Sequence, residues 1–307
     1  MIFKNKFRSD SKLFQFSNEF VDNVSDVFGA TGQKWINDLP AILDSLMQNW
    51  NAEPIAQFSN LTYSFVVRVK LKGGQDAVVK IAPPCWRTQS EIAWYRHNSV
   101  GTPKLLGFDM VRGALLLERL LPGHTLKQLI RENRDEEATE ALAQVILKLS
   151  PSKGESFKHV RELVRDLDVL DGKVDARVLE RARSIFREFT LDTSKDVCLH
   201  GDIHHDNVVA SGSDWLLIDP HGYLGPRCFE VGAMIRNPYD VFPRYASMRK
   251  ILGDRLRILQ SNLPFSAEEI SGWAYAYTIL ATAWSVGDHG EVPKEHIEIL
   301  EVLETFL

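Results

Sequence analysis

The spacing of hydrophobic and polar positions divides the chain into a β-rich part and a longer helical part. Up to about Asn51, apolar residues recur at helical spacing, most clearly in Asn37–Trp50. From Ile55 the pattern changes, because Phe65–Leu71 and Ala77–Ala82 are β-branched and partly alternating, and the Gly-Gly pair between them predicts a turn. The chain is therefore expected to begin with helix and to continue as a β-hairpin.

More strands and then mostly helices are expected after the hairpin. Trp86–Asn98 has a helical pattern and begins after two prolines, and strand-like runs follow at Lys104–Met110 and Gly113–Leu120. The stretch Cys198–Asp219 differs from its surroundings, since short apolar runs there flank polar turns. Pro122–Ile130 begins a region that is expected to be mostly helical, through Glu136–Leu149, Phe157–Val169 and Asp175–Thr190. Further helices are expected at Pro226–Arg236, Tyr245–Asn262, Ser266–Val286 and Lys294–Phe306.

This order of elements predicts an α+β protein with two lobes. Residues 1–120 would form the N-terminal helices and a small β-rich lobe, and residues 121–307 a larger helical lobe with the polar stretch. A chain of 307 residues is long enough for two lobes that each have a core.

Composition and charge narrow the function classes only slightly. The net charge of −5 argues against a nucleic-acid partner, which needs a basic surface, and is compatible with a cationic small-molecule substrate. Three cysteines at irregular spacing predict free thiols rather than disulfides or a zinc site. The first residues do not resemble a secretory signal, and no apolar run is long enough to span a membrane. We expect a cytoplasmic protein with no membrane partner, and the oligomeric state stays open.

The polar stretch contains residues at the spacing that phosphoryl transfer requires. Asp202 and Asn207 lie in HGDIHHDN, and the strand-like run WLLI ends next to Asp219. Kinases use a loop H-x-D-x-x-x-x-N to orient the attacking hydroxyl, and the Asn with a later Asp to hold Mg²⁺ on the nucleotide phosphates. Each residue alone would be interpreted as a turn or strand-end residue, but together they predict a kinase site.

Lys80 is the second indication of a kinase. It lies in the middle of a predicted strand, where a lone charge among β-branched residues has no packing reason, and Glu91 follows on the next helix. In kinases a helical glutamate holds a strand lysine whose ammonium contacts the nucleotide phosphates. The alternatives are that Lys80 faces solvent, or that Glu91 pairs with Arg87 along the helix.

Several segments together carry a resemblance to a known family. They are VVKIAPP, LLLERL, LPGHTL, LHGDIHHDNV and WLLIDPHGYLGPRCFEVGAMIRNP, of which the last two are the most specific, and they span about Ile55 to Pro238. The sequence resembles the aminoglycoside phosphotransferase superfamily, and within it the streptomycin 6-phosphotransferase and hydroxyurea phosphotransferase family. This resemblance implies a bilobal protein-kinase-like fold with a small β-rich N-lobe and a larger α-helical C-lobe.

The resemblance implies roles for the motif residues, with ATP and Mg²⁺ as cofactors. Asp202 would be the catalytic aspartate, and Asn207 and Asp219 would be the Mg²⁺ ligands. Lys80, held by Glu91, would contact the ATP phosphates.

The resemblance also implies that other segments meet the nucleotide or shape the loop. The backbone of Glu118, Arg119 and Leu120 would bind the adenine edge. The loop that begins at Ser59 would lie over the phosphates, although SNLTY departs from the glycine-rich pattern of protein kinases.

Two further motif residues concern the catalytic loop itself. Gly201 stands where protein kinases carry the arginine that binds a phosphorylated activation loop, so regulation of that kind is not expected. Glu230 is placed to brace the catalytic loop, with an ordinary helix residue as the alternative. The nearby His200 is expected to be packed structurally, and His204 and His205 to shape the loop.

The motifs do not specify the phosphate acceptor. A cationic aminoglycoside would need carboxylates around the acceptor, and aromatic residues such as Trp273 and Tyr277 could form a wall, although aromatic residues on one helix face more often belong to a core. The candidate substrate residues are Asp240, Trp284, and Asp288 and Glu291 in the turn-like segment SVGDHGEVP.

The predicted function is ATP-dependent phosphorylation of a hydroxyl group on a small molecule, either a streptomycin-like aminoglycoside or hydroxyurea. A kinase of a cellular sugar or amino alcohol is an alternative. A metal-dependent phosphoesterase would use the histidines near Asp202, but it requires an Asn-His pair that the sequence lacks. A non-catalytic nucleotide-binding pseudokinase is disfavoured because Lys80, Asp202, Asn207 and Asp219 are all present.

Overall fold

The structure is a computed structural model that describes residues 16–59, 61–149, 157–238 and 245–307. The chain forms two compact units. The first comprises the residues up to Ile92 together with Pro103–Arg119, and the second comprises Ala93–Thr102 and Leu120–Leu307. The helix α2 (Trp86–His97) therefore contributes to both units.

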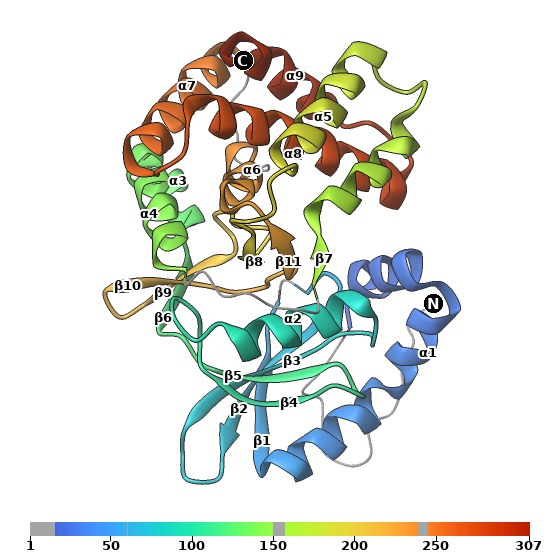
Figure 1. Cartoon of the computed structure of the whole chain (residues 1–307). Coiled ribbons are helices and arrows are strands. Elements are labelled where there is room, and N and C mark those ends of the chain that lie inside the picture. The colour runs from blue at the N-terminus through green and yellow to red at the C-terminus, as the bar shows by residue number, and fades with distance from the viewer. Residues whose placement is uncertain (1–15, 60, 150–156, 239–244) are drawn as a thin grey trace. The chain divides into compact units, whose positions relative to one another are not determined.

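The first unit is built on a five-stranded antiparallel sheet with the strand order β1-β2-β3-β5-β4 (Figure 1). The predicted hairpin is present, and Gly73 and Gly74 in its turn have φ values of 112° and 88°, a region that side chains with a Cβ disfavour. The strands are β1 (Ala52–Gln57), β2 (Phe65–Leu71), β3 (Asp76–Ile81), β4 (Leu105–Asp109) and β5 (Ala114–Glu118).

Strand β1 was not predicted, and the reason is Pro54. Proline cannot donate a ladder hydrogen bond, so it argues against a central strand and is tolerated at an edge. β1 is one of the two edge strands of the sheet, and its pairing with β2 shifts register between Pro54 and Ala56.

The long helix α1 (Asn18–Trp50), blue in Figure 1, packs against this sheet. The expected N-terminal helix is thus confirmed. Its buried side chains recur at helical spacing and form one core with the inward side chains of β2, β3 and β5. The members from α1 include Trp35, Leu39, Leu43 and Leu46, and those from the sheet include Val67, Val79 and Leu116.

The second unit is mainly helical, as predicted. Its central element is α8, which is buried along most of its length and approaches α5 so closely that a Cβ on Gly272 would lie 2.6 Å from the Phe189 ring. The helices are α3 (Lys127–Arg131), α4 (Asp135–Lys148), α5 (Ala176–Phe189), α6 (Gly232–Ile235), α7 (Tyr245–Asn262), α8 (Ala267–His289) and α9 (Lys294–Leu303), with 3₁₀ helices η1 (Val160–Leu170), η2 (Arg227–Val231) and η4 (Glu304–Phe306).

Three expectations for this unit are wrong in detail. Pro122–Ile130 is not one helix, since Pro122–Thr125 is strand β6, which pairs with β9 (Val208–Ser211) before α3 begins. Phe157–Val169 is mostly 3₁₀ helix rather than α-helix, after the short strand β7 (Lys158–His159). Helix α8 extends to His289, because Gly290 caps it in the left-handed conformation, so Asp288 lies on the helix and not in a turn.

Two small sheets contain the strands that flank the polar turns of Cys198–Asp219. Their strand orders are β10-β9-β6 and β7-β11-β8, with β8 at Val197–Leu199, β10 at Asp214–Leu217 and β11 at Tyr223–Gly225. The loop HGDIHHDN connects β8 to β9, and Asp219 follows the end of β10. Among the described residues, no helix combines the length and the apolar character needed to cross a membrane.

Candidate active site

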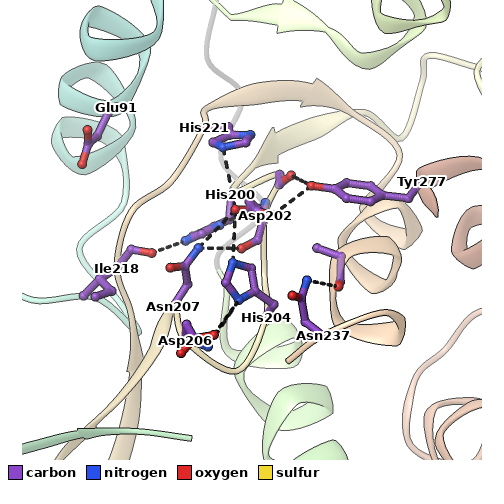
Figure 2. A network of polar contacts seen from close by, with 12 residues as sticks. Glu91, His200, Asp202, His204, Asp206, Asn207, Ile218, His221, Asn237 and Tyr277 are labelled. Carbon is purple, nitrogen blue, oxygen red and sulfur yellow. Dashed lines mark hydrogen bonds and ion pairs between the residues drawn. The ribbon is translucent and has the colours of Figure 1, made fainter. Parts of the chain in front are cut away.

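The loop between β8 and β9 places Asp202 in the middle of a polar network (Figure 2). The Asn207 side-chain amide donates to the Asp202 carbonyl oxygen at 3.0 Å and to its Oδ2 at 3.3 Å. The Nε2 atoms of His204 and His221 lie 3.3 and 3.7 Å from Oδ2. Burial alone would raise the Asp202 pKa, but these two imidazoles hold it below its ordinary value, so the carboxyl group is ionised at neutral pH.

Tyr277 on α8 contacts the other side of the same loop (Figure 2). Its hydroxyl lies 3.0 Å from Asp202 Oδ1 and 2.9 Å from the Gly201 carbonyl oxygen. The sequence pattern indicated only a core or pocket-wall residue at this position. No local signal could have revealed the contact, because it joins residues 75 positions apart.

Glu230 on η2 holds the start of the loop between β8 and β9, as the sequence predicted. Its two carboxylate oxygens accept the main-chain N–H groups of His200 at 2.6 Å and Gly201 at 2.9 Å. Gly201 has a φ of 82°, and a Cβ there would lie 2.5 Å from the Tyr223 ring, so only glycine fits. Burial raises the pKa of Glu230 to about 7, against the opposing effect of the two N–H groups.

His200 is a packed structural histidine, as expected. It is fully buried, its Nε2 lies 2.8 Å from the Ile218 carbonyl oxygen, and its ring meets the Trp94 ring edge-on. Burial lowers its pKa to about 4. His205 is also fully buried, and its burial holds its pKa well below the ordinary value, whereas His204 contacts Asp202.

The buried groups predict a specific dependence of stability on pH. Between pH 6.5 and 4 the unfolded chain binds protons at His200 and at His296, a buried residue of α9. Burial lowers the pKa of each in the folded protein to about 4, so the free energy of unfolding falls as the pH falls. Glu230 acts in the opposite direction below pH 7, because its folded pKa of about 7 lies above the ordinary 4.5. In Glu230→Gln the free energy of unfolding should therefore fall more steeply as the pH falls, by up to about 1.4 kcal/mol more per pH unit than in the wild type. Urea unfolding of both proteins between pH 5 and 7 measures the slopes, and equal slopes would contradict the assignment.

Asn207 and Asp219 present oxygen atoms that suit Mg²⁺. The Asn207 amide nitrogen is used by Asp202, which identifies Oδ1 as the atom that could bind a cation. Asp219 has a φ of 60°, an uncommon conformation for a residue with a side chain, and such backbone is frequent at functional sites. Within the described ranges, no cluster of three or more His, Cys, Asp or Glu side chains could hold a metal. Two protein ligands complemented by phosphate oxygens are the usual arrangement for Mg²⁺.

Lys80 and Glu91 form the predicted ion pair in the first unit. Lys80 Nζ lies 2.8 Å from Glu91 Oε1, and both side chains are almost fully buried. Neither alternative holds, since Lys80 does not face solvent and the Arg87 guanidinium instead lies over the Trp86 ring at 5.5 Å. A buried and paired ammonium is costly to maintain without a further role, so this pair is a candidate functional feature.

The other residues expected near the nucleotide lie where β-strands end. Glu118 is the last residue of β5, and its main-chain N–H donates to the Lys104 carbonyl oxygen at 2.9 Å. Arg119 is the last residue of the first unit, and Leu120 is the first residue of the second segment of the second unit. Ser59 is an exposed residue shortly after β1.

The candidate substrate residues have different surroundings. The Trp284 indole donates to Asp166 Oδ2 at 2.9 Å, and its ring meets the rings of Tyr277 and His221 at centroid distances of 5.8 and 5.9 Å. Asp288 and Glu291 are exposed, and Trp273 is fully buried in the core. Asp240 lies outside the described residues. Of the candidates, Trp284 is thus connected to the surroundings of Asp202.

Known proteins are similar to this chain in sequence or in fold. The chain is 31% identical over 253 residues to streptomycin 3''-kinase of Klebsiella pneumoniae, covering 79% of this chain and 91% of that protein. It is 26% identical over 291 residues to streptomycin 6-kinase of Streptomyces glaucescens, covering 91% of this chain and 94% of that protein. Among solved structures, choline kinase LicA of Streptococcus pneumoniae is similar with a TM-score of 0.58 at 12% identity, over 87% of this chain and 98% of that chain.

The structural likeness confirms the predicted protein-kinase-like α+β fold. The family model described as aminoglycoside/hydroxyurea antibiotic resistance kinase matches residues 49–289, which is most of the chain. Kinase motifs, a kinase fold and this match therefore agree, and the chain belongs to the aminoglycoside/hydroxyurea antibiotic resistance kinase family.

Proposed function

We propose that this kinase transfers the γ-phosphoryl group of ATP to a hydroxyl group of streptomycin or a closely related aminoglycoside. The observation that carries the proposal is the position of the Asp202 carboxyl group, held between Tyr277 Oη and Asn207 Nδ2. A carboxylate fixed in this way can orient an acceptor hydroxyl and take its proton. The acceptor oxygen forms a bond to the γ-phosphorus, the bond from that phosphorus to the bridging oxygen breaks, and ADP leaves.

The remaining motif residues have roles in binding ATP and its metal. Lys80, positioned by Glu91, contacts the phosphates of ATP. Asn207 Oδ1 and the Asp219 carboxylate would hold Mg²⁺, which would supply positive charge against the phosphates of ATP. The backbone of Glu118–Leu120 binds the adenine edge, and the loop at Ser59 covers the phosphates.

The choice of substrate rests on the relatives and on one feature of the second unit. Two similar proteins are streptomycin kinases, which are named for different positions of the antibiotic. The exposed Asp166 carboxylate at Trp284, close to the rings around Asp202, suits a guanidinium-bearing sugar, since guanidinium and carboxylate groups pair with two parallel hydrogen bonds. Asp288 and Glu291, which are both exposed, would add negative charge around such a cation.

An acceptor screen tests the proposed function. Purified protein with ATP and Mg²⁺ is assayed for ADP release with streptomycin, an aminoglycoside without guanidinium groups, hydroxyurea, an amino alcohol and a simple sugar. We expect turnover with streptomycin and a product that has gained one phosphoryl group by mass spectrometry. Turnover with hydroxyurea alone would keep the family and change the substrate. Turnover only of the amino alcohol or the sugar would replace the proposal with a metabolic kinase, and phosphate release from a phosphoester without ATP would replace it with a phosphoesterase.

A further inference from the structure

The Tyr277 hydroxyl on α8 contacts both the carboxylate of Asp202, the proposed catalytic residue, and the carbonyl oxygen of the residue before it. It lies within hydrogen-bonding distance of Gly201 O and Asp202 Oδ1, at 2.9 and 3.0 Å. A tyrosine hydroxyl has a single proton, so it donates to one of these acceptors or is shared between them. In either case the acceptor belongs to the catalytic loop, and the side chain ties that loop to α8.

The ring that carries this hydroxyl has little freedom to move. Tyr277 is 1% exposed, and its ring lies 5.3 Å from Phe229 and 5.8 Å from Trp284 between ring centroids. Gly232 on α6 packs directly beneath it, because a Cβ at that position would lie 2.4 Å from Tyr277 Cβ and 2.6 Å from Cγ. The close approach of α6 and α8 therefore fixes the position of the hydroxyl.

Tyr277 and Glu230 contact the two polar main-chain groups of the same residue, Gly201. Glu230 accepts the Gly201 N–H at 2.9 Å, whereas Tyr277 contacts the Gly201 carbonyl oxygen. The residue before Asp202 is thus held at both of its polar main-chain groups by side chains from two different elements. Tyr277 adds to this a contact with the carboxylate itself, which Glu230 does not make.

We infer that Tyr277 is a positioning residue for phosphoryl transfer, which holds the Asp202 carboxylate in the orientation that meets the acceptor hydroxyl. The inference rests on the proposed role of Asp202. Any buried tyrosine hydroxyl needs a hydrogen-bond partner, so a purely structural role predicts a loss of stability when the hydroxyl is removed. A positioning role predicts in addition a lower rate of the chemical step, because a small displacement of a catalytic group lowers that rate strongly.

The chain offers a matched control two residues earlier on the same helix. Tyr275 is also fully buried, and its hydroxyl donates to a carboxylate, Glu304 Oε1, at 3.3 Å. Tyr275→Phe and Tyr277→Phe remove the same atom from the same helix and leave both rings in place. Only the second change touches the catalytic loop.

Steady-state kinetics with streptomycin, or with the acceptor that the screen identifies, separate the two roles. Tyr277→Phe should lower kcat by about 10- to 100-fold with KM for ATP and acceptor little changed, whereas Tyr275→Phe should keep the kcat of the wild type. Thermal unfolding should show similar shifts for both variants. Gly232→Ala, which keeps the hydroxyl but displaces the ring, should lower kcat in the same way as Tyr277→Phe.

The outcomes distinguish this inference from the proposed function. A wild-type kcat in Tyr277→Phe, or an equal loss of kcat in both phenylalanine variants, would overturn the positioning role. If an Asp202 variant were inactive at the same time, the proposed function would still stand. Full activity of an Asp202 variant would overturn both.

Discussion

Asp202→Asn is expected to lower kcat by about 10²- to 10⁴-fold, which is the range for loss of a group that takes a proton in the transition state. Asparagine has the same shape, so the contacts with Tyr277 Oη and the surrounding rings are kept in part. It cannot accept a proton from the hydroxyl of the substrate. The affinity for ATP should change little, because the phosphates are assigned to other residues. ADP release with a saturating acceptor measures kcat, and circular dichroism and thermal unfolding check the fold.

A matched control for this variant is Asp214→Asn. Asp214 lies on the exposed part of β10, where it forms a surface ion pair with Lys148 at 2.9 Å. Such surface pairs contribute little to stability, so this variant should retain full activity. If Asp202→Asn were as active as Asp214→Asn, the proposed role of Asp202 would be wrong.

Asp219→Asn is expected to reduce activity by about 10²-fold or more at a fixed Mg²⁺ concentration and to raise the concentration needed for half-maximal rate. The physical reason is the loss of a full negative charge from the proposed metal site. Asparagine is the informative replacement, because Asp219 has a φ of 60°, which Asn adopts more readily than most residues. Alanine would combine loss of the ligand with backbone strain.

Titration with Mg²⁺ at saturating ATP measures this effect. An increase in the half-maximal Mg²⁺ concentration without a change in thermal unfolding would support the role of Asp219 as a ligand. An unchanged Mg²⁺ dependence would remove Asp219 from the metal site, whatever the effect on kcat.

The sequence predicted best what depends on local spacing. The loop with Asp202 and Asn207 could be recognised because a single turn and two short strands determine which of its side chains come together. The pair Lys80 and Glu91 was also predictable, since a charge inside a β-branched run is unusual and the next helix supplies a partner. Glu230 was recognised through the extended family motif rather than through its pattern.

Two strands and one contact of the site that the sequence did not predict depend on proline chemistry or on distant contacts. β1 and β6 each contain a proline, at Pro54 and Pro122, and were missed as strands, although both can accommodate it because they are edge strands. Tyr277 was ambiguous because a buried tyrosine on a core helix and one that reaches the catalytic loop have the same helical spacing. The same limit applies to the substrate residues, which lie outside the diagnostic segments.

The fit of Gly201 against Tyr223 has a consequence for how such an enzyme could be controlled. A larger residue at this position would meet both an unfavourable φ of 82° and the Tyr223 ring, so the arginine of protein kinases cannot be installed by one substitution. This loop therefore cannot acquire, by a single substitution, the arginine that binds a phosphorylated activation loop in protein kinases. We therefore expect that activation by phosphorylation of such a loop plays no part here, and that the rate of reaction depends on the amounts of the protein and of its substrates.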